Sequence, residues 1–120
     1  MAARHGQLLN AVLKLCAVYD VIVRKQNTGC VAYQVKNKRR FVRFNAPGTP
    51  DIEGYFGKSW GPFKGHHIAI EVKVGRDEIS ELQWVYLWRV NANGGLGVQV
   101  RDTVDNIEAI LKERRKLLKP

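Results

Sequence analysis

Three segments of the chain carry apolar residues at helical spacing. The first covers residues 7–19, and the second covers residues 80–93 and is followed by two glycines. The third follows a cap at Asp102 or Thr103 and reaches Leu117. Short polar residues before the first turn and glycine after the last turn are common helix boundaries. We therefore predict three helices.

Six further segments are rich in β-branched and aromatic residues and are predicted to be strands. They cover residues 21–23, 31–35, 41–44, 52–56, 67–74 and 97–100. A polar turn over 36–39 would pair the second and third strands in a hairpin, and 67–74 has the near-continuous apolar start of a central strand. The Pro- and Gly-rich segments 46–50 and 57–65 are expected to be loops. The order αβββββαβα predicts an α/β fold with a mixed β-sheet flanked by helices.

Length and composition fit a single domain over residues 1–120. The chain has 120 residues, of which 45% are hydrophobic and 26% charged, so it has the composition of a folded chain. The longest apolar region, 8–23, is interrupted by Asn10, Lys14 and Asp20, which argues against a membrane span. The N-terminus also lacks the apolar core of a signal peptide. We therefore expect an intracellular protein with no membrane partner.

The few cysteines and histidines do not suggest a disulfide framework or a zinc site. Cys16 and Cys30 lack metal-ligand spacing and are expected to be buried free thiols. The three histidines are too few and too poorly placed to complete a zinc site.

Positive charge is concentrated in the first half of the chain. The chain has 20 Lys and Arg against 11 Asp and Glu, a net charge of +9. Residues 1–50 hold nine of the basic residues and one acid, whereas residues 51–120 hold 11 basic and 10 acidic residues. Because Lys and Arg release counterions from phosphate backbones, the first half suits a polyanion. The predicted DNA-backbone contacts are the basic residues of the hairpin, Lys36, Lys38, Arg39, Arg40 and Arg43. The alternative is a solvated basic turn.

Two acids and a lysine in the second half are placed for metal chemistry. Asp51 opens one predicted strand, and Glu71 and Lys73 lie near the end of the next. Residues two apart in a strand share a face, so Glu71 and Lys73 point the same way. If the two strands pair, Asp51 and Glu71 could converge on one Mg²⁺ ion, which prefers oxygen ligands. A lysine beside that ion could orient a water and stabilise charge growing on a phosphate.

These residues and their surroundings resemble a known nuclease family. Pro50-Asp51 is followed, twenty positions after the aspartate, by Glu71-Val72-Lys73, the pattern of the PD-(D/E)xK nucleases. Together with Asn27-Thr28-Gly29, the basic hairpin and Ile79-Ser80-Glu81-Leu82-Gln83, the sequence is similar to the VRR-NUC (virus-type replication-repair nuclease) branch. The resemblance covers roughly residues 5–111 and implies a restriction-endonuclease-like fold of the stand-alone, phage type.

The resemblance implies a role for each matching residue. Asp51, Glu71 and the backbone carbonyl of Val72 would be ligands of Mg²⁺ or Mn²⁺. Lys73 would position the attacking water, and Gln83 would lie near the site. The family's chemistry is phosphodiester hydrolysis that leaves 5′-phosphate and 3′-hydroxyl ends. Stand-alone relatives imply branched DNA such as four-way (Holliday) junctions, in the cytoplasm of a bacterial or phage-infected cell.

Several of these positions have a second interpretation. Gln83 follows Ser80 at the spacing of a capping box, in which a glutamine at the third helical position bonds back to the N-cap. Asp51 could instead satisfy amides of the preceding turn. The family usually has a glutamate in its first helix, where this chain has His5 or Gln7 and no acid. Glu53 shares a strand face with Asp51 and could substitute, but we interpret it as a solvated strand residue.

Aromatic residues suggest two further surfaces. Those near the Gly-rich loop could stack on an unpaired base or pack over the sheet edge, and they are Tyr55, Phe56, Trp60 and Phe63. Trp84, Tyr86 and Trp88 make the 80–93 helix apolar on more than one side, which suggests a homodimer.

The sequence therefore predicts a metal-dependent DNA endonuclease, structure-selective for branched DNA. A different class remains open, because the first helix lacks an acid. In that alternative the chain is a non-catalytic nucleic-acid-binding module on a degenerate nuclease fold. A third alternative is an exonuclease that trims DNA ends.

Overall fold

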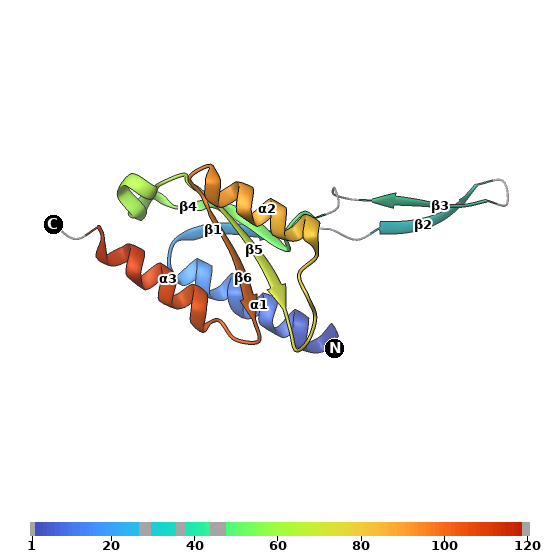
Figure 1. The fold of residues 1–120 in the computed structure, drawn as a ribbon, viewed down its shortest axis with the longest axis horizontal. Helices are drawn as coiled ribbons and strands as arrows, with labels where there is room; N and C mark the ends of the chain where they lie inside the picture. The colour runs from blue at the N-terminus through green and yellow to red at the C-terminus, as the bar shows by residue number, and fades with distance from the viewer. Residues whose placement is uncertain (1, 27–29, 36–37, 44–47, 119–120) are drawn as a thin grey trace.

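A computed structural model describes residues 2–26, 30–35, 38–43 and 48–118, with only the backbone described for 2–3, 30–35 and 39–43. The elements in chain order are α1 (Ala2–Val18), β1 (Val21–Lys25), β2 (Cys30–Val35), β3 (Lys38–Arg43), β4 (Ile52–Phe56), the 3₁₀ helix η1 (Lys58–Phe63), β5 (His67–Lys73), α2 (Glu81–Ala92), β6 (Leu96–Arg101) and α3 (Asp105–Lys116). Figure 1 shows their arrangement. No helix among the described residues is long and apolar enough to cross a membrane.

The central sheet has four strands in the order β1-β4-β5-β6. The pairs β1–β4 and β4–β5 are antiparallel, and β5–β6 is parallel, so the sheet is mixed. The predicted α/β fold with a helix-flanked mixed sheet is confirmed. The element order differs from the predicted one, because η1 occupies 58–63 where a loop was expected.

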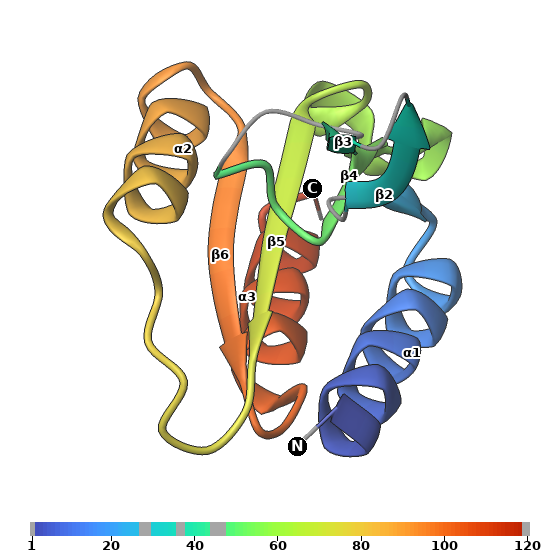
Figure 2. The same ribbon diagram turned by 90° about the vertical axis from the view of Figure 1, so that its right-hand side faces the viewer.

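Helices cover both faces of this sheet. Figures 1 and 2 show α2 on one face and α1 with α3 on the other. The larger core lies between the sheet and α1 and α3, where Val12, Ile70 and Leu111 are fully buried. The smaller core, beneath α2, contains Ala69 and Leu87. Alternate residues of β5 therefore enter two different cores, which explains its near-continuous apolar sequence.

Close packing of α2 on β6 depends on a glycine. A Cβ added at Gly97 would lie 2.4 Å from the backbone oxygen of Leu87. At the start of α2, the Ser80 side chain accepts a hydrogen bond from the Gln83 amide, and the Gln83 side chain accepts one from the Ser80 amide. The predicted capping box is therefore present. The predicted cap of α3 is wrong: its N-cap is Val104, one residue beyond Thr103, without a side-chain cap bond.

The segment predicted as a second loop is held by an aromatic anchor. Trp60 of η1 is fully buried, and its indole N–H donates to the carbonyl of Tyr19 at 2.7 Å. Its ring meets Phe56 edge to face, with ring centroids 4.9 Å apart. Phe63 is half-buried against the same core, whereas Tyr55 is exposed. Of the four aromatics considered for stacking on a base, only Tyr55 has a largely exposed ring.

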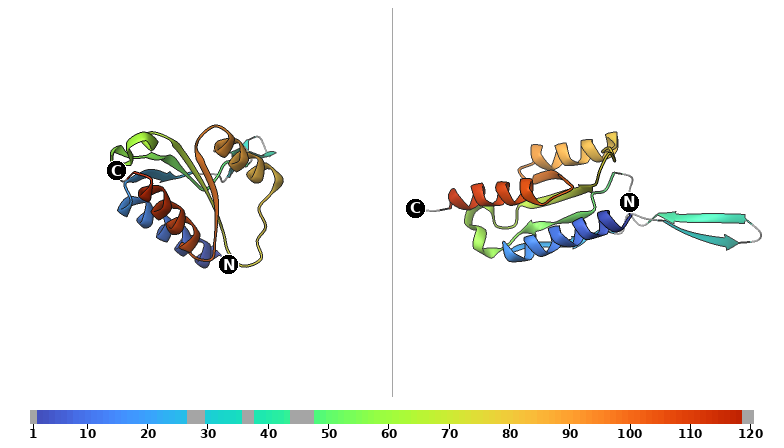
Figure 3. Two further views of the ribbon diagram at one scale, coloured as in Figure 1. Left: turned by 60° about the vertical axis from the view of Figure 1, so that its left-hand side comes forward. Right: turned by 90° about the horizontal axis from the view of Figure 1, so that it is seen from below.

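The hairpin β2–β3 forms a separate two-stranded sheet. It projects from the body along the long axis of the molecule, whose extents are 65 × 27 × 24 Å (Figures 1 and 3). Strand β3 begins at Lys38, inside the segment predicted as the turn, because pairing continues from Val35 to Lys38. Below the hairpin, the amide of Gln26 donates to the carbonyl of Asp51 at 2.7 Å, extending the β1–β4 pair by one bond.

Helix α2 exposes much of its apolar surface. Leu87 and Val90 face the sheet and are buried. The exposed apolar side chains are Leu82, Trp84, Val85 and Trp88. The predicted breadth of this apolar surface is therefore present.

Candidate active site

Antiparallel pairing of β4 with β5 brings the predicted acids together. The register pairs Ile52 with Ile70, so Asp51 and Glu71 are next in line. The side chains of Ile52 and Ile70 enter the larger core, and those of Asp51 and Glu71 therefore lie on the α2 face of the sheet. Asp51 Oδ2 accepts a hydrogen bond from the Val72 amide at 2.9 Å. Asp51 thus bonds across the strands.

Glu71 is the buried acid of this cluster, with 2% of its surface exposed. Its Oε1 accepts a hydrogen bond from Gln83 Nε2 at 3.1 Å and lies 3.6 Å from Lys73 Nζ. Its buried Oε2 has no hydrogen-bond partner among the described residues. Burial, and then the nearby Asp51 carboxylate, raise the pKa of Glu71 to about 8, while Lys73 opposes this rise.

Lys73 is mostly buried, with 15% of its side chain exposed. It lies two residues after Glu71 on the same strand face, as the period of a strand predicts. Its ammonium group is therefore held beside the Glu71 carboxylate at the end of β5. The Val72 side chain between them enters the larger core, while the Val72 carbonyl oxygen lies at this edge within 3.0 Å of His5 Nε2.

Helix α1 contributes a histidine where an acid was expected. His5 Nε2 lies 3.0 Å from the carbonyl oxygen of Val72 and 3.5 Å from Asp51 Oδ2. Of the two first-helix candidates, the structure thus brings His5 to the site, while Gln7 is exposed. The imidazole brings a ring nitrogen close to two oxygen atoms, the Val72 carbonyl oxygen and Asp51 Oδ2, but it does not supply negative charge.

Gln83 combines both roles considered for it. Its Oε1 accepts from the Ser80 amide at 2.9 Å, and its Nε2 donates to Glu71. The amide can do both because its oxygen and nitrogen are on opposite branches. The start of α2 and the buried carboxylate are therefore linked through one side chain.

Glu53 is not a solvated strand residue, which corrects our interpretation. Its side chain is 17% exposed and accepts hydrogen bonds from the Tyr86 hydroxyl and from Gln26 Nε2. His67 Nε2 lies 3.3 Å from its Oε1. The sequence did not indicate Tyr86 as a residue of the site, although it lies three residues after Gln83 and hence on the same helix face. Burial of Tyr86, and then the nearby Glu53 carboxylate, raise the pKa of the Tyr86 hydroxyl to about 12.

The donor atoms at the site fit a hard divalent cation. No group of three or more His, Cys, Asp or Glu side chains within the described ranges is placed to hold a metal ion. The available oxygen donors are the carboxylates of Asp51 and Glu71 and the Val72 carbonyl. Mg²⁺ is commonly held by one or two carboxylates while it keeps several waters. The buried, unpartnered Oε2 of Glu71 is an acceptor that such a cation would satisfy.

The predicted basic DNA contacts are only partly described. Lys38 is exposed at the start of β3. Lys36 lies outside the described residues, as do the side chains of Arg39, Arg40 and Arg43.

Of the two cysteines predicted to be buried free thiols, Cys16 is one, and the Cys30 side chain lies outside the described residues.

Comparisons with known proteins did not identify a relative of this chain. The family resemblance and the fold that it implies therefore rest on the residues described above. A search of protein-family models, curated proteins and solved structures found no match to the chain.

Proposed function

We propose that this chain is a metal-dependent DNA endonuclease with a restriction-endonuclease-like fold. The observation that carries the proposal is the buried Glu71 carboxylate, which lies near Asp51 and Lys73 and whose Oε2 has no hydrogen-bond partner among the described residues. A buried acid without a full set of partners is unfavourable for folding, so such groups are concentrated at functional sites. The charge of +9 supports a polyanionic substrate.

Each residue has a role that follows from its position. Asp51, Glu71 and the Val72 carbonyl would hold Mg²⁺ or Mn²⁺. When bound, the ion would polarise the phosphate and lower the pKa of a coordinated water. Lys73, with its ammonium 3.6 Å from Glu71 Oε1, would orient the attacking water and stabilise charge on the phosphate oxygens. Gln83 would keep the Glu71 carboxylate in place.

The proposed reaction is hydrolysis of one phosphodiester bond. The water oxygen forms a bond to phosphorus while the bond from phosphorus to the 3′-oxygen breaks. The proton lost by the water passes to solvent, and the departing 3′-oxygen takes up a proton. The products are a 5′-phosphate and a 3′-hydroxyl.

A cleavage assay on circular duplex, flap and four-way junction DNA tests this function. We expect nicking with Mg²⁺ or Mn²⁺ that stops in EDTA and is strongest on the junction. Lys73→Ala should reduce the cleavage rate about 100-fold or more while DNA affinity, measured by fluorescence anisotropy, is retained. Lys112→Ala, an exposed lysine on α3, is the matched control and should cleave normally. Equal cleavage by the wild type, Glu71→Ala and Lys73→Ala would refute the proposal.

One observation favours a second function, a non-catalytic DNA-binding module. The first helix presents His5 at the site, so the cluster formed by the described residues holds two carboxylates, Asp51 and Glu71. In that case the wild type binds DNA but leaves all three substrates intact with either metal. An exonuclease would instead trim linear DNA and spare the circular duplex.

The exposed apolar side of α2 supports a homodimer as part of the proposal. Trp84 and Trp88 lie one turn apart, and 59% and 61% of their surfaces are exposed. A two-fold dimer would present two sites to the two strands of a junction. Sedimentation velocity should give twice the monomer mass for the wild type and the monomer mass for a Trp84→Glu, Trp88→Glu double variant.

A further inference from the structure

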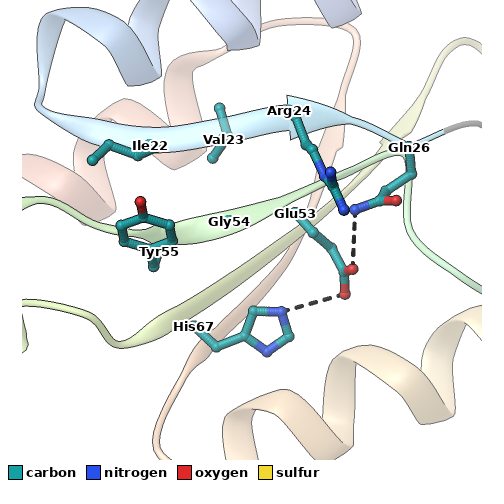
Figure 4. Close-up of a pocket in the computed structure, with 8 residues that line it drawn as sticks. All are labelled: Ile22, Val23, Arg24, Gln26, Glu53, Gly54, Tyr55 and His67. Carbon is teal, nitrogen blue, oxygen red and sulfur yellow. Dashed lines mark hydrogen bonds and ion pairs between the residues drawn. The ribbon is translucent and has the colours of Figure 1, made fainter.

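A groove on the sheet lies next to the candidate site and has no role in the mechanism above. Among the described residues, helix α2 packs mainly on β5 and β6 and reaches β4 through Tyr86. The groove has a volume of about 410 Å³ and is open to solvent (Figure 4). It takes its floor from β1 and β4 and one wall from His67 at the start of β5.

The apolar part of the groove is a cross-strand pair. Ile22 of β1 and Tyr55 of β4 are directly opposite each other in the register. Each is 48% exposed, whereas their strand neighbours Val21 and Phe56 are buried in the larger core. Figure 4 shows the Tyr55 ring and the Ile22 side chain side by side at one end of the groove. An exposed aromatic ring beside an aliphatic side chain is a platform on which a flat ring can stack.

A basic residue lies beside this platform. Arg24 is exposed and faces Glu53 across the strands. The Glu53 carboxylate, however, is already occupied by Tyr86, Gln26 and His67. Within the described part of the chain, no carboxylate lies close enough to form an ion pair with Arg24. Its guanidinium is therefore available to an external anion.

We propose that this groove binds an unpaired nucleotide of the DNA substrate, with its base stacked on Tyr55 beside Ile22 and its phosphate held by Arg24. This inference rests on the proposed function, since it supplies the substrate class that the candidate site would act on. A groove of about 410 Å³ is within the range of small-molecule sites. A free cation beside a stacking platform is the combination that binds single-stranded DNA.

The groove and the candidate site lie on the same face of the segment that contains β4. Tyr55, Glu53 and Asp51 are alternate residues of one chain segment and lie on the same face. Four residues of a strand span about 13 Å, so the stacked base would lie about four nucleotides from the reacting phosphate at the duplex rise of 3.4 Å per nucleotide. An extended strand would cover the same distance with fewer nucleotides. The groove would thus select DNA that carries an unpaired stretch near the cleavage position.

Binding measured in EDTA tests the groove separately from cleavage. The probes are a blunt duplex and a duplex with a ten-nucleotide single-stranded overhang that carries 2-aminopurine at successive positions. Tyr55→Ala removes the platform, Tyr55→Phe keeps it, and Arg24→Gln removes the cation. Leu117→Ala and Lys112→Gln are controls, because they change an exposed apolar and an exposed basic residue elsewhere. Thermal unfolding verifies that each variant is folded.

We expect the wild type and Tyr55→Phe to bind the overhang more tightly than the blunt duplex and to quench 2-aminopurine at one or two positions. Tyr55→Ala should lose the quenching and bind the overhang about 5- to 100-fold more weakly, with blunt-duplex affinity unchanged. Arg24→Gln should weaken overhang binding and lower its salt dependence by about one phosphate contact. The control variants should behave as the wild type.

Two results separate this inference from the proposed function. If Tyr55→Ala binds the overhang as the wild type does, or weakens binding to both DNAs equally, the groove assignment is overturned even if cleavage occurs. If Tyr55-dependent quenching is observed but no substrate is cut with Mg²⁺ or Mn²⁺, the nucleotide site stands and the nuclease function fails. Absence of DNA binding by the wild type overturns the groove assignment.

Discussion

Replacing Glu71 by glutamine should change how the stability of the metal-free protein depends on pH. The pKa of Glu71 is raised from 4.5 to about 8, mainly by burial and then by Asp51. Between these two pH values the folded protein keeps the proton, whereas the unfolded chain releases it. The unfolded state therefore binds fewer protons, and the free energy of unfolding falls as the pH rises from about 4.5 to about 8. The Glu71→Gln side chain is neutral throughout and removes this dependence.

The size of the effect follows from the same pKa values. At about 1.4 kcal/mol for each pH unit, full ionisation in the folded state would lower the free energy of unfolding by at most about 5 kcal/mol. Relaxation and entry of water reduce the penalty of a buried charge, so we expect roughly 2–3 kcal/mol. The wild type and Glu71→Gln should be about equally stable at pH 5. At pH 9 the variant should be the more stable protein by this amount.

Urea unfolding in EDTA, followed by circular dichroism at five pH values from 5 to 9, measures this difference. Glu113→Gln changes an exposed acid on α3 and serves as the control, with a nearly constant difference from the wild type. In a parallel series without EDTA, added Mn²⁺ should stabilise the wild type at pH 8 but leave Glu71→Gln unchanged, because the ion requires an ionised carboxylate. Parallel stability curves for the wild type and Glu71→Gln over this range would refute the reasoning.

Three further predictions concern other parts of the molecule. Gly97→Ala should lower the free energy of unfolding by about 2–3 kcal/mol, because its Cβ would collide with the Leu87 carbonyl, and an unchanged thermal midpoint would contradict this close approach. Ser80→Ala should lower the free energy of unfolding, measured in urea, by about 1 kcal/mol because the helix loses its N-cap. Ser59→Ala is not a suitable control, because the Ser59 hydroxyl donates a hydrogen bond to Asp20. Burial raises the pKa of Cys16 to about 11, so iodoacetamide at pH 8 should label it only after unfolding, as measured by peptide mass spectrometry. Rapid labelling of the folded protein would show that the thiol is accessible.

Local patterns in the sequence were sufficient to locate most elements and the candidate acids. The apolar period distinguished the helices from the strands, and Ser80 with Gln83 marked the start of α2. The period of two in β5, combined with one antiparallel pairing, was enough to bring Asp51, Glu71 and Lys73 to one place. The helix and capping-box inferences succeeded because each depends on residues within a few positions of one another. The approach of Asp51 to Glu71, twenty positions later, needed only the pairing of two consecutive strands.

Features that depend on distant segments were not predictable in this way. The partners of Glu53 come from the end of β1, from β5 and from α2, so no local spacing indicated that the carboxylate is satisfied. The 3₁₀ helix η1 is held by Trp60, whose hydrogen bond is to Tyr19, 41 residues earlier. Alternation within 31–35, followed by the turn and the strand predicted at 41–44, predicted the hairpin but not that it forms a sheet of its own. Alternation of apolar residues indicates that one face of a strand is buried, but it does not identify the element against which that face packs.

The bond from the Gln26 amide to the Asp51 carbonyl closes the base of the segment that carries the projecting hairpin. Strands β1 and β4 remain adjacent whatever the length of the chain between them, because they pair directly with each other. Loop-closure entropy grows only slowly with loop length, so this segment is a position where insertions are tolerated. In evolution, the length and charge of the segment between β1 and β4 can therefore change while Asp51 keeps its position immediately before β4. Under the proposed function, the DNA contacts of the hairpin and the chemistry at Asp51 could therefore change independently of each other.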